Sequence, residues 1–365
     1  MTAPIEDIRV HAFRIPTDQE ESDGTLVWDS TTLVLVELTA GGRTGIGYTY
    51  SDASAAAIVA KRLAPLVRGL DAAGIGRAWT AMLSATRNMG TRAVSAAAIS
   101  AVDNALWDLK ARLLEVPLVE LFPVVHESVP VYGSGGFTSY SDDQLAKQFS
   151  GWVESGIRMV KMKVGREPDR DVQRVKAARK VIGDDVALFV DANGAFTWKR
   201  ALWFAEAFAD VGVTWFEEPV PSDDLTGLRL LCEHGPAGME IAAGEYGWDV
   251  THFQRLLDAR AVDVLQADAT RCCGMTGFLV AGALSTARLV DLSAHTAANL
   301  HAHVCPAVPR MRHIEYFHDH ARIEEMLFDG ALVPTGGALR PDRSRHGMGL
   351  AFKWQDAEPY RLAVP

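Results

Sequence analysis

Six polar residues recur at a nearly constant interval in the second half of the chain, each at or just after the end of a short apolar run. Counted from Lys163, the steps are 28, 26, 28, 23, 27 and 20 residues, and they reach Asp191, Glu217, Glu245, Asp268, His295 and Glu315. A strand, a loop, a helix and a second loop occupy about that many residues in a βα unit. Repeated units build a (β/α) barrel, whose active site lies at the carboxyl ends of its strands. We therefore expect these side chains, which are distant in sequence, to meet in one pocket.

Two lysines precede this series. Lys161 and Lys163 lie two residues apart in Val160-Lys161-Met162-Lys163-Val164, an apolar and partly β-branched run that is typical of a strand. Alternation along a strand places both ammonium groups on one face. Two like charges side by side inside a fold are costly, and each lowers the pKa of the other. The pair therefore indicates anionic groups nearby, or chemistry that compensates the repulsion.

The first part of the chain has a different pattern. Strands are predicted at 8–16 and 31–38 and helices at 54–68, 75–89 and 92–114, which indicates an α+β capping domain over residues 1–125. A polar stretch, Asp18 to Gly24, separates the first two strands. We expect a lid loop here, at about residues 18–28; a solvated surface loop is the alternative.

From residue 126 onwards strands and helices alternate, which predicts an α/β fold, a (β/α)7β-type modified TIM barrel over residues 126–320. The segment 321–365 is rich in turn residues, and we expect it to return and pack on the capping domain. The barrel strands are predicted at 129–132, 159–164, 186–190, 213–216, 239–243, 262–266, 290–293 and 313–317.

Composition excludes some partners. A formal net charge of −10 over 365 residues argues against nucleic acid or an anionic membrane surface, because either would require a basic face. The charge permits a small anionic substrate, since a bound cation can reverse the local field. The four cysteines lack disulfide-framework spacing, which suggests a reducing compartment. We see no signal peptide and no run of bilayer length, and therefore expect a cytoplasmic protein.

Three carboxylates define a candidate metal site. Asp191, Glu217 and Glu245 come from three successive strand ends, and they would repel each other strongly without a cation. A set of oxygen ligands without His or Cys favours a hard ion, so Mg²⁺ is expected, with Mn²⁺ as the alternative. Any one of these acids alone would more often be a surface residue, but three in register opposite a Lys-x-Lys strand favour the metal site.

A histidine and an acid are expected on the other side of this site. His295 follows the seventh predicted strand and Asp268 follows the sixth, so the carboxylate can bond the imidazole and select its tautomer. A lone histidine near a strand end is usually structural. A histidine with an acid one βα unit earlier, facing a lysine pair across the barrel, is more often functional.

The chain resembles the enolase superfamily in its mandelate racemase subgroup, over nearly its whole length. Each motif is weak alone, but their order is specific: Lys161-Met162-Lys163, Asp191-Ala192-Asn193, Glu217-Glu218-Pro219, Gly244-Glu245, Gln266-Ala267-Asp268, Ser293-Ala294-His295 and Ile314-Glu315. Enolase-superfamily sites use a Lys or His base with Mg²⁺ that stabilises an enediolate.

The resemblance implies roles for the triad and the lysines. Asp191, Glu217 and Glu245 would hold Mg²⁺. Lys163 would remove the proton α to a carboxylate, and Lys161 would lower the pKa of Lys163 and contact the substrate carboxylate. A dianionic enediolate needs such positive charges in a dry site.

The resemblance also implies roles for four residues on the later strands. His295, held by Asp268, would be the second acid/base. Glu315 would be a protonated hydrogen-bond donor to the carboxylate oxygen that gains charge, and Asn193 would contact a substrate hydroxyl. The partner would be a small anionic substrate, a sugar acid or a 2-hydroxy acid, and the enzyme would form a homo-oligomer.

The reaction depends on what the β-carbon carries. If it carries a hydroxyl, His295 can assist its departure as water, which gives a hydro-lyase that converts an aldonate or aldarate to a 2-keto-3-deoxy acid. Without a leaving group, reprotonation gives a racemase or epimerase, and a cycloisomerase is a third alternative. Acid-sugar dehydration is the commoner activity in chains with this resemblance. A barrel that only binds and an aldolase-type Schiff-base lysine are weaker alternatives.

Two features depart from the expected pattern. The subgroup commonly has Gly-Gly after the sixth-strand Asp segment, whereas this chain has Cys273-Gly274. Cys273 is expected to be an inert small core residue, or else to change the shape of that loop. A group of histidines, whose irregular spacing fits no closed zinc site, is expected to be solvent-facing or to support the site: His301, His303, His313, His318 and His320.

Overall fold

The computed structural model describes residues 3–364. The chain begins with an antiparallel sheet whose strand order is β15-β1-β2-β3. Its two longest strands carry buried Val, Leu and Ile side chains, because β-branched and apolar side chains pack well on a pleated surface. The strands are β1 (Asp7–Ser22), β2 (Val27–Ala40), β3 (Arg43–Tyr50) and β15 (Arg361–Leu362).

Helices cover one face of this sheet and complete the cap. The longest, α4 (Val94–Leu113), is buried along most of its length and packs on β2 and β3. The other cap helices are α1 (Ser54–Ile58), the π-helical segment η1 (Val59–Leu63), α2 (Ala64–Val67) and α3 (Ile75–Thr86), with the 3₁₀ segment η2 (Leu118–Leu121) at the end of the cap.

Eight parallel strands close into the barrel, because β11 pairs with β4 as well as with β10. This confirms the predicted fold class, a modified TIM barrel with an N-terminal α+β cap. The strands are β4 (Val129–Gly135), β5 (Met159–Lys163), β6 (Ala187–Asp191), β7 (Val213–Glu217), β8 (Glu240–Ala243), β9 (Val264–Ala267), β10 (Asp291–Ala294) and β11 (Met311–Phe317).

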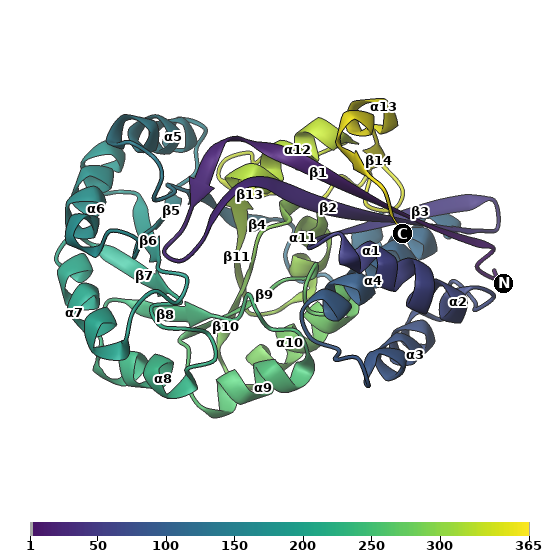
Figure 1. Cartoon of the computed structure of the whole chain (residues 1–365), viewed down its shortest axis with the longest axis horizontal. Coiled ribbons are helices and arrows are strands. Elements are labelled where there is room, and N and C mark those ends of the chain that lie inside the picture. Colours follow the sequence, from purple (N-terminus) through teal and green to yellow (C-terminus); the bar gives the residue numbers. More distant parts are fainter. Residues whose placement is uncertain (1–2, 365) are drawn as a thin grey trace.

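Helices connect successive barrel strands and lie on the outside of the barrel (Figure 1). Their apolar faces pack on the strands, and the interior between the strands is filled by a separate aromatic cluster that includes Tyr132, Phe189 and Trp215. The connecting helices are α5 (Asp142–Glu154), α6 (Pro168–Ile182), α7 (Trp198–Ala209), α8 (Leu225–His234), α9 (Val250–Asp258), α10 (Gly274–Ala287) and α11 (Ala298–Val304), the last followed by η3 (Cys305–Ala307).

The C-terminal segment contacts both the barrel and the cap. Its last strand, β15, pairs with β1 of the cap sheet, and β13 pairs with β4 of the barrel. The prediction of a turn-rich segment from residue 321 is wrong for its start, because α12 (His318–Leu327) continues through it. The remaining elements are β12 (Phe328–Asp329), β13 (Ala338–Leu339), β14 (Ala351–Phe352), α13 (Trp354–Ala357) and η4 (Glu358–Tyr360).

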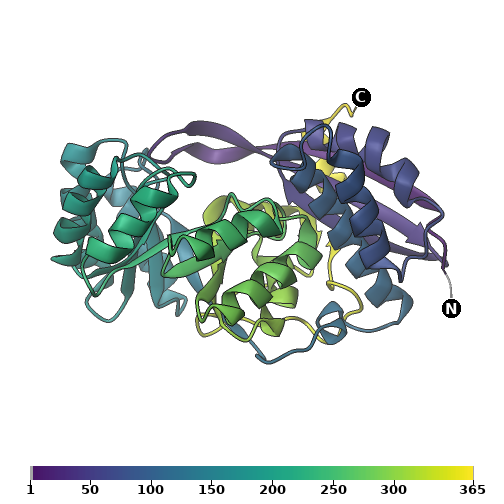
Figure 2. The ribbon, with the colours of Figure 1, turned by 90° about the horizontal axis from the view of Figure 1, so that it is seen from below.

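The strands β1 and β2 extend past the cap as a two-stranded arm that reaches across to the barrel (Figures 1 and 2). The expected lid loop at about 18–28 is therefore largely a hairpin, with an irregular register between Pro16 and Glu21. Its tip touches the barrel, where Thr138 donates from its backbone N to Ser22 O at 2.8 Å. A Cβ on Gly24 would lie 2.3 Å from Ala192 O, so only glycine permits this approach.

Among residues 3–364, no helix has both the length and the apolar composition that crossing a membrane requires.

Candidate active site

A cavity of about 510 Å³ lies between the carboxyl ends of the barrel strands and the cap. The barrel contributes polar side chains to its wall, among them Lys163, Glu245 and His295. The arm and the end of β3 contribute the facing wall, which includes Trp28 and Tyr50. The position is the one expected for the active site of a parallel barrel.

Strand register explains why the predicted site residues meet. Lys163 pairs with Asp191 across β5 and β6, and Asp191 pairs with Glu217 across β6 and β7. Side chains at equivalent positions of neighbouring parallel strands point the same way. Asp268 and His295 follow β9 and β10 directly, and the last residues of these strands, Ala267 and Ala294, also pair.

Glu245 reaches the site by a different route. It follows β8 by two residues, after Gly244, whose φ of 135° is disfavoured for residues with a side chain. A Cβ at Gly244 would lie 2.1 Å from Gln266 O of the neighbouring strand. The glycine therefore lets the chain turn tightly against β9 and direct Glu245 into the cavity wall.

The three carboxylates Asp191, Glu217 and Glu245 form a compact, buried group. Each offers one oxygen such that the three oxygens lie within 4.8 Å of one another, and the three residues are at most 3% exposed. Burial, followed by repulsion from Asp191, raises the pKa of Glu217 to about 8. Three converging anionic oxygens with no nitrogen or sulfur donor fit a hard divalent cation such as Mg²⁺.

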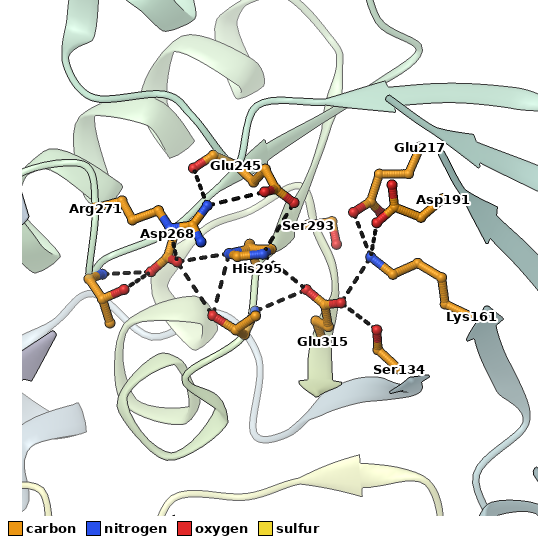
Figure 3. Close-up of polar contacts among 12 residues, drawn as sticks. Ser134, Lys161, Asp191, Glu217, Glu245, Asp268, Arg271, Ser293, His295 and Glu315 are labelled. Carbon is orange, nitrogen blue, oxygen red and sulfur yellow. Dashed lines mark hydrogen bonds and ion pairs between the residues drawn. The ribbon is translucent and has the colours of Figure 1, made fainter. Parts of the chain in front are cut away.

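Both lysines point into this carboxylate group, as the alternation predicts. Lys161 Nζ lies 2.5 Å from Glu217, 2.9 Å from Glu315 and 3.5 Å from Asp191 (Figure 3). Lys163 Nζ lies 2.5 Å from Asp191. Two buried ammonium groups thus face several carboxylates, which compensates their mutual repulsion.

The lysine pKa differs from the expectation. Burial and the charge of Lys161 both lower the pKa of Lys163, but Asp191 and Glu245 outweigh them and leave it above its usual value. For Lys161, burial likewise lowers the pKa, while Glu217 and Glu315 raise it well above the usual range. The predicted lysine–lysine effect is present, but several surrounding acids raise the pKa and reverse the net direction.

His295 and Asp268 form the predicted pair. The imidazole Nδ1 lies 2.8 Å from Asp268 Oδ2, so an Nδ1–H that donates to this carboxylate leaves Nε2 facing the site. Nε2 lies 3.2 Å from Glu245 and 3.7 Å from Glu315. Burial lowers the pKa of His295, but Glu245 and Glu315 outweigh it and raise the pKa to about 9.

Glu315 differs from the expectation that it is a protonated donor. Its carboxylate accepts from Ser134 Oγ at 2.5 Å and from Thr296 N at 3.2 Å, and it pairs with Lys161. Burial alone would raise its pKa, but Lys161 and His295 hold the pKa well below its usual range. In this structure Glu315 is therefore a carboxylate that accepts hydrogen bonds.

Asn193 lies at the cavity wall, two residues after β6. Its backbone N donates to Asp191 Oδ1 at 2.9 Å, and its φ of 46° is in the left-handed region that asparagine tolerates better than most residues. The buried side-chain oxygen Oδ1 has no hydrogen-bond partner among residues 3–364. An unpaired buried acceptor beside the triad is suited to bind a ligand group.

Sequence reasoning missed several residues of the site. Arg271 lines the cavity, and its guanidinium contacts Glu245 at 3.1 Å and Asp268 at 3.6 Å. Glu218 is 1% exposed, and burial followed by repulsion from Glu245 raises its pKa well above the usual range. Arg271 follows Asp268 by three residues, so a search for cations close to each strand-end acid would have found it.

The predicted histidine group is spread over several environments. His301 accepts from Ala269 N at 2.9 Å and supports the loop after β9, while His313 is buried beside Tyr132 and Trp215 below the site. His303 bonds Met348 O at 3.0 Å. The other two contact the arm and the cap: His318 lies 3.0 Å from Asp18, and His320 stacks on Tyr50.

Cys273 is buried and precedes α10. Its φ of 66° and ψ of 35° are left-handed, which is the conformation that a glycine at this position would adopt without strain. Its carbonyl accepts from Trp79 Nε1 at 2.8 Å. The chain thus keeps the backbone path that glycine would favour, in agreement with the interpretation of Cys273 as a small core residue.

The fold and the site together define a class of enzyme. These are barrel enzymes in which a buried carboxylate triad binds a divalent metal, and lysines and a His–Asp pair flank it. Such enzymes act on carboxylates. The chain belongs to the mandelate racemase/muconate lactonizing enzyme family of the enolase superfamily. Residues 144–357 match the model for enolase C-terminal domain-like proteins, and residues 22–122 match the mandelate racemase / muconate lactonizing enzyme N-terminal domain.

The chain is similar to known proteins over nearly its full length. A 3,6-anhydro-alpha-L-galactonate cycloisomerase from Streptomyces coelicolor is 34% identical over 96% of this chain and 98% of its own length. A mandelate racemase/muconate lactonizing enzyme-like protein from Rubrobacter xylanophilus superimposes with a TM-score of 0.97 at 52% identity, covering 98% of this chain and 100% of that one. L-talarate/galactarate dehydratase from Salmonella typhimurium LT2, solved with Mg and L-lyxarohydroxamate, gives a TM-score of 0.91 at 26% identity, covering 100% and 94%.

Magnesium is present in several solved relatives, and the buried triad of this chain is consistent with a magnesium site. Relatives at about 30% identity include both sugar-acid dehydratases and cycloisomerases. The chain is therefore a magnesium-dependent enzyme of this subgroup.

Proposed function

We propose that the protein removes the proton α to a carboxylate and dehydrates a sugar acid to a 2-keto-3-deoxy acid. The proposal rests on the positions of two acid/base groups, which contact different carboxylates of the triad. Lys163 contacts Asp191, and His295 contacts Glu245. A substrate carboxylate at the triad would therefore place its α- and β-carbons between a lysine and a histidine. Both groups also line the cavity.

The triad would hold Mg²⁺, with Mn²⁺ as the alternative ion. When bound, the ion supplies positive charge that stabilises a negatively charged carboxylate group. Lys161, which contacts Glu217 and Glu315, would add a second positive charge at the substrate carboxylate. Glu315 would position Lys161 through their 2.9 Å contact. The buried setting excludes water and strengthens each of these interactions.

In the proposed reaction, Lys163 in its uncharged form takes the α-proton, and the C–H electrons move towards the carboxylate. His295 then donates a proton to the β-hydroxyl, the C–O bond breaks and water leaves. The resulting enol gains a proton at the β-carbon and becomes the 2-keto-3-deoxy acid. Asp268 would hold the tautomer of His295, and Asn193 would contact a hydroxyl of the sugar through its unpaired Oδ1.

Cycloisomerisation is the second candidate, because the relative at 34% identity over almost the whole chain is a cycloisomerase. The same pair of acid/base groups would serve it. The two reactions differ in the group that leaves the β-carbon. Dehydration releases water, whereas a cycloisomerase opens or closes a ring without losing an atom, so the mass of the product separates them.

The test is a screen of a sugar-acid library in D₂O with Mg²⁺, followed by proton NMR and by an assay for 2-keto acids. A 2-keto-3-deoxy product that is lighter than its parent acid by one water, from one or a few stereoisomers, supports dehydration. Loss of the α-proton signal without a keto acid favours a racemase or epimerase, and a ring-opened or ring-closed isomer favours a cycloisomerase. Magnesium binding without reaction on any acid would contradict the proposed chemistry.

Two further expectations stay predictions. The cysteine spacing predicts a reducing compartment, and the cytoplasm is the proposed location. A homo-oligomer is predicted from the family, and a sedimentation measurement of the native mass would decide it.

A further inference from the structure

The cavity has two walls of opposite character. The barrel wall carries the basic side chains of the cavity, Lys163, Arg271 and His295, together with the acids Glu245 and Glu315. The cap wall carries two acids, Asp23 and Asp52, beside aromatic and hydroxyl side chains such as those of Trp28 and Ser51. Among residues 3–364, no lysine or arginine of the cap lines the cavity. A substrate whose carboxylate lies at the triad would point its other end at this wall.

The two acids of the cap wall differ in exposure: Asp52 is exposed, whereas Asp23 is buried. Asp52 accepts from Ser54 N at 2.8 Å, and the side-chain and backbone hydrogen bonds of Ser54 lower its pKa. Asp23 Oδ1 accepts from Thr25 N at 2.6 Å and from Leu26 N at 2.7 Å, at the tip of the arm. Both residues line the cavity, and the hydrogen bonds whose distances are given above use only one oxygen of each carboxylate, so the other can accept from a partner that donates hydrogen bonds.

The basic groups of the cavity are already paired on the barrel side. Lys163 contacts Asp191, and Arg271 contacts Glu245 at 3.1 Å and Asp268 at 3.6 Å. His320 also lines the cavity, but burial lowers its pKa to about 3, so it is neutral. Arg166 Nη1 reaches Leu26 O at 3.5 Å at the tip of the arm, and Arg166 does not line the cavity.

We propose that this enzyme selects monocarboxylic sugar acids, with an uncharged hydroxyl-bearing distal end, and rejects the corresponding dicarboxylic acids. The inference rests on the proposed function, because it assumes that the reacting carboxylate lies at the triad. A second carboxylate would then face the carboxyl groups of Asp23 and Asp52, with no lysine or arginine of the described part of the cap lining the cavity to offset the repulsion. A terminal hydroxyl can donate to the same oxygens.

The experiment compares matched substrates. Hexonates and the hexarates of the same configuration, such as galactonate with galactarate and gluconate with glucarate, are assayed in D₂O with Mg²⁺ for turnover and α-proton exchange. The affinities of the enzyme for the same acids are measured in parallel by titration calorimetry, so monoacids and diacids can be compared even where turnover is slow. The expected result is a higher kcat/KM and tighter binding for the monoacid of the reactive configuration.

Variants of Asp52 test the cause. Asp52→Asn keeps an acceptor for Ser54 N but removes the charge, and Asp52→Lys reverses it. Asp52 is exposed, so its charge acts through water. Removing a like charge about 4 Å from the distal carboxylate in such a setting should raise the diacid-to-monoacid ratio of kcat/KM roughly fivefold, and the reversal roughly twentyfold. Asp184→Asn is the matched control, because Asp184 is exposed in the loop that precedes β6, at the amino end of the barrel strands.

The outcomes are separable. Preference for a diacid, or equal use of both, overturns the inference while leaving the proposed chemistry intact. An unchanged ratio in Asp52→Lys also overturns it, because the cap-wall charge would then have no part in selection. If no acid reacts but monoacids bind more tightly than diacids, the proposed function fails and the charge selectivity holds.

Discussion

Asp103 gives a prediction about stability that can be worked out from the structure. It lies on α4 of the cap and is completely buried, and it accepts from Thr276 N at 2.9 Å and from Thr276 Oγ1 at 2.7 Å. Thr276 is in the first turn of α10, so a side chain of the cap bonds the amino end of a barrel helix. Burial raises the pKa of Asp103 to about 7, although both hydrogen bonds to Thr276 lower it.

The direction of the pH effect follows from this shift. In the unfolded chain Asp103 ionises near pH 3.9, whereas in the folded chain it keeps its proton until about pH 7. Between these values the folded state binds more protons, so the free energy of unfolding falls as the pH rises. About three pH units at about 1.4 kcal/mol each give roughly 4 kcal/mol, and this is an upper bound because the positive amino end of α10 favours the anion by up to about 2 kcal/mol.

The substitution Asp103→Asn removes the titration but keeps a buried acceptor for Thr276 N. We expect the free energy of unfolding of the variant to gain about 1–3 kcal/mol relative to that of the parent protein between pH 5 and pH 8. Urea unfolding followed by far-UV circular dichroism at constant Mg²⁺ measures this difference. Asp184→Asn, which removes an exposed carboxylate, should follow the parent at every pH.

Parallel stability curves for Asp103→Asn and the parent protein would refute the reasoning, because they would mean that Asp103 has the same charge in the folded and unfolded chains. If the stability of the parent protein instead rises relative to that of the variant as the pH rises, the helix end and the two hydrogen bonds lower the pKa of Asp103 more than burial raises it.

Three further predictions concern the site. Lys163→Ala should lower the rate of α-proton exchange by a factor of about 10²–10⁴ with an unchanged circular dichroism spectrum. Exchange at the parent rate would show that Lys163 is not the base. His295→Asn should lower dehydration by about 10²–10⁴ while Lys163-driven exchange in D₂O persists; unchanged dehydration would make His295 structural. Asp191→Asn should weaken Mg²⁺ binding at least about tenfold by titration calorimetry, and unchanged affinity would reject the triad.

The site could largely be predicted from the sequence because it depends on local periodicity. Parallel strands of similar length place the residues at their carboxyl ends side by side, so equal spacing in sequence becomes register in space. Lys163, Asp191 and Glu217 are neighbours for this reason. Glu245 also lies beside them, although the backbone reaches it through Gly244 rather than through the end of β8.

The arm could not be predicted in the same way, because its conformation depends on pairing and tertiary contacts. The polar stretch that begins at Asp18 has the composition of a loop. It is extended because β1 and β2 continue to pair and because Ser22 and Gly24 contact the barrel. Tertiary contacts of this kind override local propensity. The same holds for the charge of Glu315, which depends on the 2.9 Å contact with Lys161 from a distant strand.

The pattern of ion pairs separates the groups proposed for proton transfer from the groups proposed for substrate selection. The cations of the barrel wall contact carboxylates of the barrel itself, so a change in the cap leaves this compensation in place. The cap wall contributes acids that no basic residue of the cavity wall contacts, and a substrate must complement them. A change of charge at the cap wall should therefore alter which acids bind while the groups proposed for proton transfer stay in position.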